Sequence, residues 1–289
     1  MTHVLVLIAA GLALLYVGLL VLLWRFQEQI VFQPPRGVAP SDVSARQVHY
    51  AAEDGTSLFA FIVGDCNPTS TLVLAFHGNA DLARWFVPWA SELARTANTC
   101  VMIPEYRGYD GLGGNPSYAA SAYDARAALA FARDSLGVRS DHLVYYGHSL
   151  GTAIATELAA SDPPRALVLQ SPFTSARDMS RRLSVPGVSA FWALISRVHF
   201  ETANRVRALT MPVSVAHGDK DLIIPIEMGR TVFNAAKHPG ELLVVPGAGH
   251  NDVAEIGGRA YWTWLAHAVH AGDPASPSLD ARAKTRSAP

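Results

Sequence analysis

Cysteine and charge are the scarcest features of this sequence. Two of the 289 residues are cysteines, Cys66 and Cys100, and only 16% of the residues are charged. Two cysteines are too few for a disulfide framework, and they lack the clustered spacing of a zinc site. No H-E-x-x-H or related metal signature occurs, so the sequence implies neither a metal nor a cofactor.

Runs of lysine or arginine are also missing, and the formal net charge is -1. Binding to nucleic-acid phosphates needs a clustered basic surface, so we expect no nucleic-acid partner. The chain is instead rich in apolar material, since 50% of its residues are hydrophobic. That content supports a sizeable core and is unlike a disordered chain. The length allows one large domain or two small ones.

One long hydrophobic run, Val4–Trp24, stands at the N-terminus and has no charge in 21 positions. As a helix rising about 1.5 Å per residue, it would cross a hydrocarbon core of about 30 Å. A cleaved signal peptide should be shorter and end at small residues, and a core helix this apolar is rare at a chain end. We therefore predict a single transmembrane anchor over residues 4–24. By the positive-inside rule, Arg25, Arg36 and Arg46 weakly favour a cytoplasmic catalytic domain.

The rest of the chain divides by composition and periodicity. Residues 25–46 contain several prolines and are expected to form a juxtamembrane linker, and residues 47–271 are expected to form the main domain. This domain opens with a hairpin over residues 47–63. Six short apolar runs follow, at residues 71–76, 100–103, 142–146, 166–169, 213–216 and 242–245. Helical stretches separate them, at residues 82–97, 118–136, 150–160, 227–237 and 253–270.

This alternation predicts an α/β fold, with a mostly parallel twisted sheet, helices on both faces and an antiparallel hairpin at one edge. The long connection over residues 174–210 is expected to form a small helical cap over a site, although an ordinary pair of surface helices is the alternative. Residues 272–289 are rich in Ala, Ser and Pro and are expected to form a disordered tail.

The residues Gly147-His148-Ser149-Leu150-Gly151 match the pattern G-x-S-x-G. The pattern alone is common, but here it lies between an expected strand and an expected helix, as a nucleophile elbow requires. Side chains at the two glycines would collide with neighbouring backbone in such a tight turn. The alternative is a plain glycine-rich turn with a capping serine. We predict Ser149 as the nucleophile.

A serine hydroxyl needs a base, and the base needs a carboxylate to orient it. His250 follows the last apolar run and fits the chain order Ser…Asp…His. Chemistry alone leaves both Asp219 and Asp221 open as the acid. The backbone N–H groups of Leu150 and Asn79 are the expected oxyanion donors. Four other histidines in or beside strands are expected to be structural: His77, His142, His148 and His217.

These motifs together resemble the α/β-hydrolase superfamily, and in particular its membrane-anchored abhydrolase-domain branch, which includes protein depalmitoylases and lipid hydrolases. The similar segments are AFHGNA, PEYRGYDGLGGNPS, GHSLG, HGDKDLIIP and GAGHND. The resemblance implies that Asp221 is the catalytic acid. The chain departs from the branch pattern at Glu105, where Asp is usual, and at Asp110, where Gly is usual.

The sequence thus predicts a serine hydrolase of carboxylic esters or thioesters, acting on a small-molecule or acylated substrate. An amidase or peptidase of the same fold is the alternative, and a catalytically silent, membrane-tethered binding protein is disfavoured because all three triad residues are present. The expected cap suggests an apolar wall for an acyl chain. Its apolar residues are Leu183, Val185, Phe191, Trp192, Leu194 and Ile195.

Overall fold

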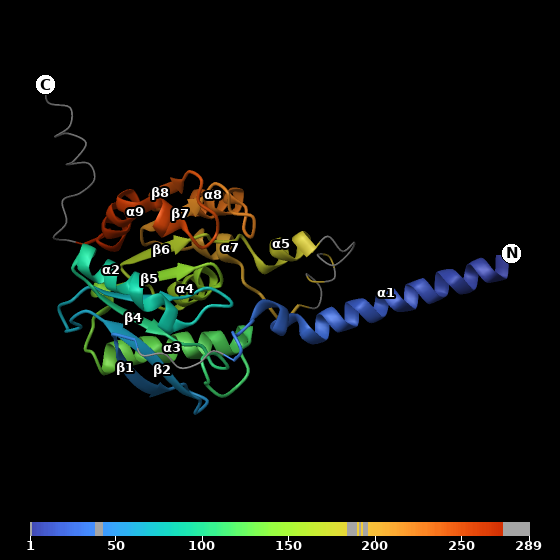
Figure 1. Ribbon diagram of the computed structural model, residues 1–289, viewed down its shortest axis with the longest axis horizontal. Coiled ribbons are helices and arrows are strands. Elements are labelled where there is room, and N and C mark those ends of the chain that lie inside the picture. The colour runs from blue at the N-terminus through green and yellow to red at the C-terminus, as the bar shows by residue number, and fades with distance from the viewer. Residues whose placement is uncertain (1, 38–42, 184–189, 191, 193–195, 274–289) are drawn as a thin grey trace, which may run out of the picture.

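The computed structural model describes residues 2–37, 43–183, 190, 192 and 196–273. Its first element, α1 (Thr2–Val31), is a single helix whose apolar side chains are largely exposed, and it projects away from the rest of the molecule (Figure 1). The helix continues well beyond Trp24 into the segment expected to be a linker. No proline or glycine interrupts the chain between Trp24 and Pro34, so nothing ends the helix earlier.

Eight strands form one sheet in the order β1-β2-β4-β3-β5-β6-β7-β8. The strands are β1 (Arg46–Ala51), β2 (Ser57–Val63), β3 (Leu72–Phe76), β4 (Cys100–Pro104), β5 (Leu143–His148), β6 (Ala166–Gln170), β7 (Val213–Gly218) and β8 (Pro239–Val245). β2 runs antiparallel to β1 and β4, and the neighbours from β4 to β8 are parallel. The predicted sheet and its edge hairpin are therefore confirmed. The inner strands are buried on both faces, which explains their nearly continuous apolar sequence.

Helices cover both faces of the sheet, as predicted (Figure 1). The core on one face includes side chains of α2 (Val87–Ala97) and α9 (Val253–Val269). The core on the other face includes side chains of α3 (Tyr118–Asp134), α4 (Leu150–Ser161) and α8 (Ile226–Ala235). Short helices complete the described chain: η1 (Ala83–Phe86), η2 (Ser140–His142), α5 (Ala176–Ser180), η3 (Arg181–Leu183) and α7 (Thr202–Val206).

The segment expected to form a cap is described only in part. It contains α5, η3 and α7, together with Trp192, which is buried. Four residues of the predicted acyl-chain wall lie outside the described residues: Val185, Phe191, Leu194 and Ile195. The same holds for most of the expected tail, from residue 274 onward.

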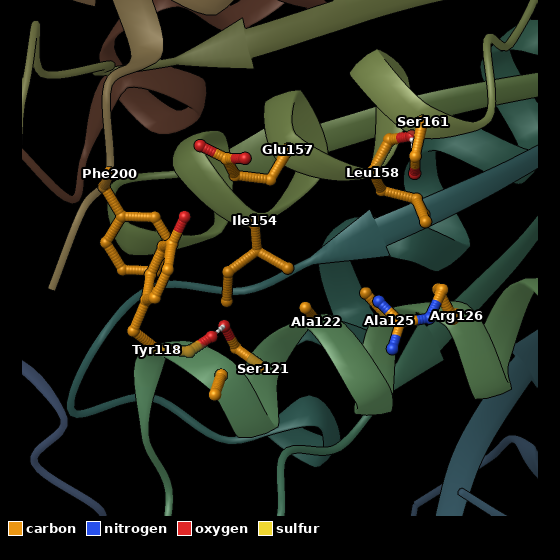
Figure 2. A pocket seen from close by; sticks show the side chains of 11 residues that line it. Tyr118, Ser121, Ala122, Ala125, Arg126, Ile154, Glu157, Leu158, Ser161 and Phe200 are labelled. Carbon is orange, nitrogen blue, oxygen red and sulfur yellow. Dashed lines mark hydrogen bonds between the residues drawn. The ribbon is translucent and has the colours of Figure 1, made fainter. Parts of the chain in front are cut away.

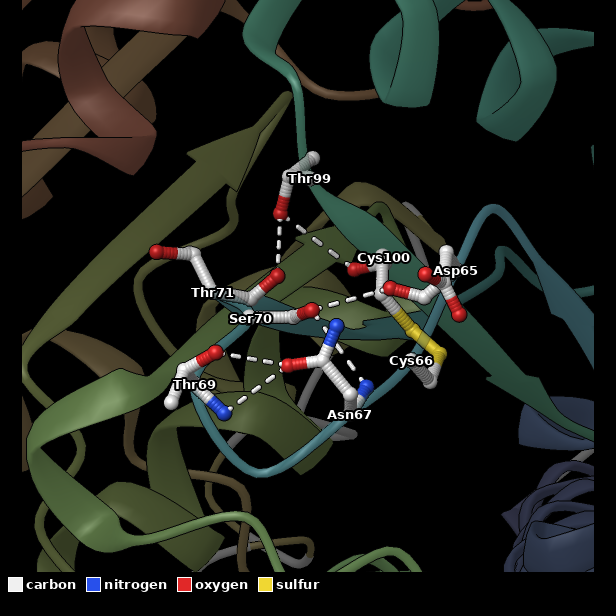
Figure 3. The surroundings of a disulfide bond; sticks show 8 residues. All are labelled: Asp65, Cys66, Asn67, Thr69, Ser70, Thr71, Thr99 and Cys100. Carbon is white, nitrogen blue, oxygen red and sulfur yellow. Dashed lines mark hydrogen bonds between the residues drawn. A yellow bond between two sulfur atoms is a disulfide. The ribbon is translucent and has the colours of Figure 1, made fainter.

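A disulfide bond joins Cys66, in the loop after β2, to Cys100, the first residue of β4 (Figure 3). The sequence offered no argument for this pair beyond the presence of two cysteines. Asn67 stiffens the same loop, because its side-chain oxygen accepts hydrogen bonds from the backbone N–H and the hydroxyl of Thr69. The bridge therefore ties two segments together across 34 residues of sequence.

Candidate active site

Ser149 stands in a sharp turn between the end of β5 and the start of α4. Its φ is +53°, in the left-handed region that residues other than glycine rarely adopt. The flanking glycines make this turn possible. A Cβ at Gly147 would lie 2.3 Å from the carbonyl oxygen of Gly151, and a Cβ at Gly151 would lie 2.1 Å from that of Phe76. The local geometry thus matches the strained elbow that the sequence predicts.

A chain of hydrogen bonds connects three side chains from three separate loops. Nε2 of His250 lies 2.8 Å from Oγ of Ser149, and Nδ1 of His250 lies 2.7 Å from Oδ2 of Asp221. An ionised carboxylate only accepts hydrogen bonds, so Nδ1 carries the proton and Nε2 is free to accept the serine proton. The structure therefore brings together the serine, the histidine and one of the two candidate aspartates.

Asp221 is held firmly in the loop after β7. Its side chain is fully buried, and its Oδ1 accepts the backbone N–H groups of Ile223 at 2.9 Å and Ile224 at 2.8 Å. Burial by itself raises the pKa of the Asp221 carboxyl, but hydrogen bonds from His217, His250 and Ile224 outweigh it and hold this pKa well below its usual range. Asp221 is therefore an anion at neutral pH.

Asp219 has a different role in the structure. It is exposed, and its Oδ1 accepts the backbone N–H of Gly247 at 2.7 Å, in the loop that leads to His250. It makes no described contact with the imidazole of His250. Residue chemistry left both aspartates open as the partner of His250. In the structure Asp221 contacts His250, and Asp219 does not.

The two expected oxyanion donors flank Ser149. Leu150 is the first residue of α4, so its N–H has no acceptor within the helix. Asn79 lies in the loop after β3, and its neighbour Gly78 packs against the elbow, because a Cβ there would lie 3.5 Å from Cβ of Ser149. The side-chain oxygen of Asn79 accepts hydrogen bonds from the hydroxyl of Tyr109 at 2.9 Å and the backbone N–H of Gln33 at 2.7 Å.

A buried ion pair holds the loop between β3 and η1, residues 77–82, which is called the oxyanion loop below. Nε2 of His77 lies 2.9 Å from Oε1 of Glu105, and both side chains are inaccessible to solvent. The other oxygen of Glu105 accepts the backbone N–H of Ala83, also at 2.9 Å. Burial alone lowers the pKa of His77, but the charge of Glu105 and its hydrogen bond to the ring raise that pKa above its ordinary value. Glu105, a departure from the resembled pattern, thus bonds both the start of the oxyanion loop and the first residue of η1, the helix that follows it.

The second departure, Asp110, is also explained. Its φ is +45°, which accounts for the usual glycine there. Oδ2 of Asp110 accepts a hydrogen bond from Nε of Arg84, in η1, at 2.6 Å. This largely buried ion pair joins the loop around Tyr109 to the helix that follows the oxyanion loop.

The remaining histidines only partly fit the structural role expected for them. Nε2 of His148 donates to the carbonyl oxygen of His250 at 3.2 Å, and burial lowers the pKa of His148 to about 3, helped by the proximity of His250. His217 contacts Asp221 directly, a feature that sequence reasoning missed. The spacing H-G-x-x-D, which places His217 four residues before the acid, was the available signal.

One cavity of about 200 Å³ lies between α3 and α4, away from Ser149 (Figure 2). Tyr118 and Phe200 lie at one end, and Ile154 and Leu158 line the side formed by α4. No residue of the serine–histidine–aspartate group borders it, so it is not the reaction site. Among the described residues, no group of His, Cys, Asp or Glu side chains could hold a metal ion.

Known proteins resemble this chain both in sequence and in fold. A family model described as "Serine aminopeptidase, S33" matches residues 67–204, which include Ser149 but neither Asp221 nor His250. The uncharacterized protein Rv2307c of Mycobacterium tuberculosis is 34% identical over 263 residues, covering 87% of this chain and 90% of the relative. Human alpha/beta hydrolase domain-containing protein 17B is 30% identical over 197 residues, which cover 66% of this chain and 65% of the relative.

Solved structures share the fold at low sequence identity. The esterase Pf2001 of Pyrococcus furiosus superposes with a TM-score of 0.63 at 16% identity, covering 82% of this chain and 96% of that one. The structure of DcsB in complex with its substrate analogue superposes with a TM-score of 0.62 at 15% identity, covering 78% of this chain and 99% of that one. At these identities the likeness concerns the arrangement of helices and strands.

Proposed function

The chain belongs to the α/β-hydrolase superfamily, and from that membership we propose that it cleaves carboxylic esters or thioesters with Ser149 as nucleophile, His250 as base and Asp221 as orienting acid. The observation that carries the proposal is the continuous chain of hydrogen bonds from Ser149 through His250 to Asp221. The esterases among the structural neighbours favour the same bond type.

The proposed reaction has two stages. Oγ of Ser149 attacks the acyl carbon while Nε2 of His250 takes its proton, and the negative oxygen receives hydrogen bonds from the N–H groups of Asn79 and Leu150. The intermediate collapses as His250 returns the proton to the leaving alcohol or thiol, which leaves the acyl group on Ser149. A water molecule then attacks this ester with help from His250, and the acid product leaves. Asp221 stays ionised throughout and stabilises the charged imidazole.

The substrate class follows from the anchor and the expected cap. We propose an acyl chain, because α1 would hold the reaction site near lipid and apolar side chains of the cap would wall the pocket. Each buried methylene contributes about 0.8 kcal/mol, or roughly fourfold in affinity. The value of kcat/KM should therefore rise from acetyl to octanoyl in a series of simple esters or thioesters. Activity that peaks at acetyl and falls by butyryl would contradict an acyl pocket.

Labelling with a fluorophosphonate probe tests the nucleophile directly. Ser149→Ala should abolish labelling and hydrolysis while the melting temperature of the protein stays close to that of the wild type. Persistent labelling of the folded variant would exclude Ser149. An amidase or peptidase remains the second candidate, because the matching family model is described as a serine aminopeptidase. Aminoacyl anilides tested beside esters of the same acyl group separate the two.

We propose that α1 is a single-pass anchor, since it is long, apolar and largely exposed. The disulfide between Cys66 and Cys100 supports a proposal for the side of the membrane on which the catalytic domain lies. Disulfides persist in oxidising compartments and are rare in the cytosol. This argues against the cytoplasmic side that three scattered arginines weakly favour, and we propose that the catalytic domain lies outside the cytoplasm. A thiol-reactive polyethylene glycol should fail to modify either cysteine unless the protein is first reduced.

A further inference from the structure

The C-terminal end of α1 is docked onto the catalytic domain. Gln27 is 2% exposed, and its side-chain oxygen accepts hydrogen bonds from the backbone N–H of Arg197 at 2.7 Å and the hydroxyl of Ser196 at 3.1 Å. The guanidinium of Arg197 in turn donates to the carbonyl oxygen of Trp24 at 3.2 Å and lies over its ring, 5.2 Å from the centroid. The helix is therefore attached to the segment that precedes α7 by several polar contacts.

The chain beyond the helix is also fixed. Phe32 is 2% exposed and belongs to the hydrophobic core, with its ring 6.3 Å from that of Phe200. This packing places the next residue, Gln33, beside the oxyanion loop. Residues 24–33, the docked end of α1 and the two residues after it, are called the exit segment below.

A hydrogen bond joins the exit segment to the oxyanion loop at the side chain of Asn79. The backbone N–H of Gln33 donates to Oδ1 of Asn79 at 2.7 Å, and the hydroxyl of Tyr109 donates to the same oxygen at 2.9 Å. Two donors on one atom identify it as the amide oxygen. Asn79 is thus held by two hydrogen bonds, one from Tyr109 in the catalytic domain and one from Gln33 in the exit segment.

The oxyanion loop needs such support. Ala80, the residue after Asn79, has a φ of +52°, a conformation that costs free energy for any side chain. An oxyanion donor works only if it is fixed before the reaction, and a misplacement of about 1 Å can cost about 100-fold in rate. A hydrogen bond that restrains the side chain of Asn79 also restrains the peptide group whose N–H is the expected donor.

We propose that the exit segment is a positioning element for the oxyanion loop, so that the turnover rate depends on docking of the membrane anchor onto the catalytic domain. The inference rests on the proposed function, because it assumes that the N–H of Asn79 stabilises the oxyanion. It goes further in giving the anchor a part in turnover as well as in localisation. Gln33 does not touch the substrate and acts through Asn79.

The test uses two substitutions at one position in the full-length protein. Gln33→Pro removes the backbone N–H, whereas Gln33→Ala keeps it and removes only an exposed side chain. We expect Gln33→Pro to lower kcat about ten- to hundredfold with KM within about twofold of wild type, and Gln33→Ala to match wild type. The rate is expressed per serine titrated with a fluorophosphonate, so that loss of folded protein does not count as loss of turnover.

A second pair covers the case in which Gln33→Pro does not fold. Gln27→Ala removes the acceptor that docks the helix, and Gln29→Ala changes an exposed position on the same helix. Only the first should lower kcat per titrated serine. Unchanged kcat per serine in a folded Gln33→Pro or Gln27→Ala variant would overturn the positioning role. Ser149→Ala is assayed in parallel: if it stays active, the proposed function itself fails, and if it is inactive, the outcome concerns the exit segment alone.

Discussion

Nε2 of His217 lies 3.2 Å from Oδ2 of Asp221, the same oxygen that bonds Nδ1 of His250 at 2.7 Å. The acid therefore contacts two imidazoles, one that faces Ser149 and one that is completely buried. The same nitrogen, Nε2 of His217, lies 2.9 Å from the carbonyl oxygen of Ile224. This contact closes the turn that contains Asp221. This arrangement fixes the carboxylate on both sides and explains why its pKa is held low.

The first prediction separates the two aspartates of the loop after β7. Asp221→Asn should lower kcat by about 10⁴-fold, because the imidazole of His250 loses its orientation and correct tautomer. Asp219→Asn is the matched control and should change kcat far less, since Asp219 only accepts the N–H of Gly247. Steady-state kinetics of both purified variants give the ranking. The reverse order would make our assignment of the acid wrong.

The second prediction concerns pH and the buried pair of His77 and Glu105. The pKa of His77 is raised in the folded protein, so the pair contributes its full stability below the unfolded histidine pKa of about 6.5 and loses it as pH rises through the folded value. His77→Gln should therefore lower the melting temperature most near pH 6 and less as pH increases. His238→Gln, at an exposed position, should leave the pH dependence unchanged. Thermal melts from pH 5 to 9 measure the difference in melting temperature between the wild type and His77→Gln. A difference that grows as pH increases would contradict the prediction.

The third prediction concerns the anchor. Deleting residues 1–25 should release a soluble and active domain, because Gln27, Phe32 and Gln33 remain and keep their contacts with the domain. Fractionation of membranes washed with carbonate shows whether the protein is released. Retention of the truncated protein in those membranes would refute a single anchor.

The fourth prediction concerns the disulfide. Replacing both Cys66 and Cys100 by Ala should lower the free energy of unfolding by about 2–4 kcal/mol, the usual contribution of a bridge that closes a loop of this size. The wild type should lose a similar amount on reduction, whereas the double variant should not respond to reductant. Turnover at low temperature should change little, since Cys66 and Cys100 make no described contact with Ser149, His250 or Asp221. Equal stability of oxidised and reduced wild type would show that the cysteines do not pair.

Local patterns in the sequence were enough to predict the sheet, its helices and the elbow. Short apolar runs alternating with helical stretches can be buried only in a parallel sheet with two covered faces, and this was found. The glycines beside Ser149 predicted a tight turn, and a Cβ at Gly147 would indeed collide with Gly151, a few residues away in the chain. The collision that forbids a Cβ at Gly151 is with Phe76, which only the fold brings near. The helix α1 extends past the predicted anchor of residues 4–24, because a change from apolar to polar residues after Trp24 does not stop a helix.

The sequence by itself thus determined the class of fold, the strand–turn–helix pattern around Ser149 and the apolar N-terminal helix, since each is written in residues close together in the chain. Only the tertiary structure decided which groups meet across long separations. The contacts of Asn79 with Gln33 and of Asp221 with both His217 and His250 are of this kind, as is the bond between Cys66 and Cys100. Hydrogen bonds and disulfides act only at short range, so these pairs form where the packed sheet and helices bring distant loops to the same place.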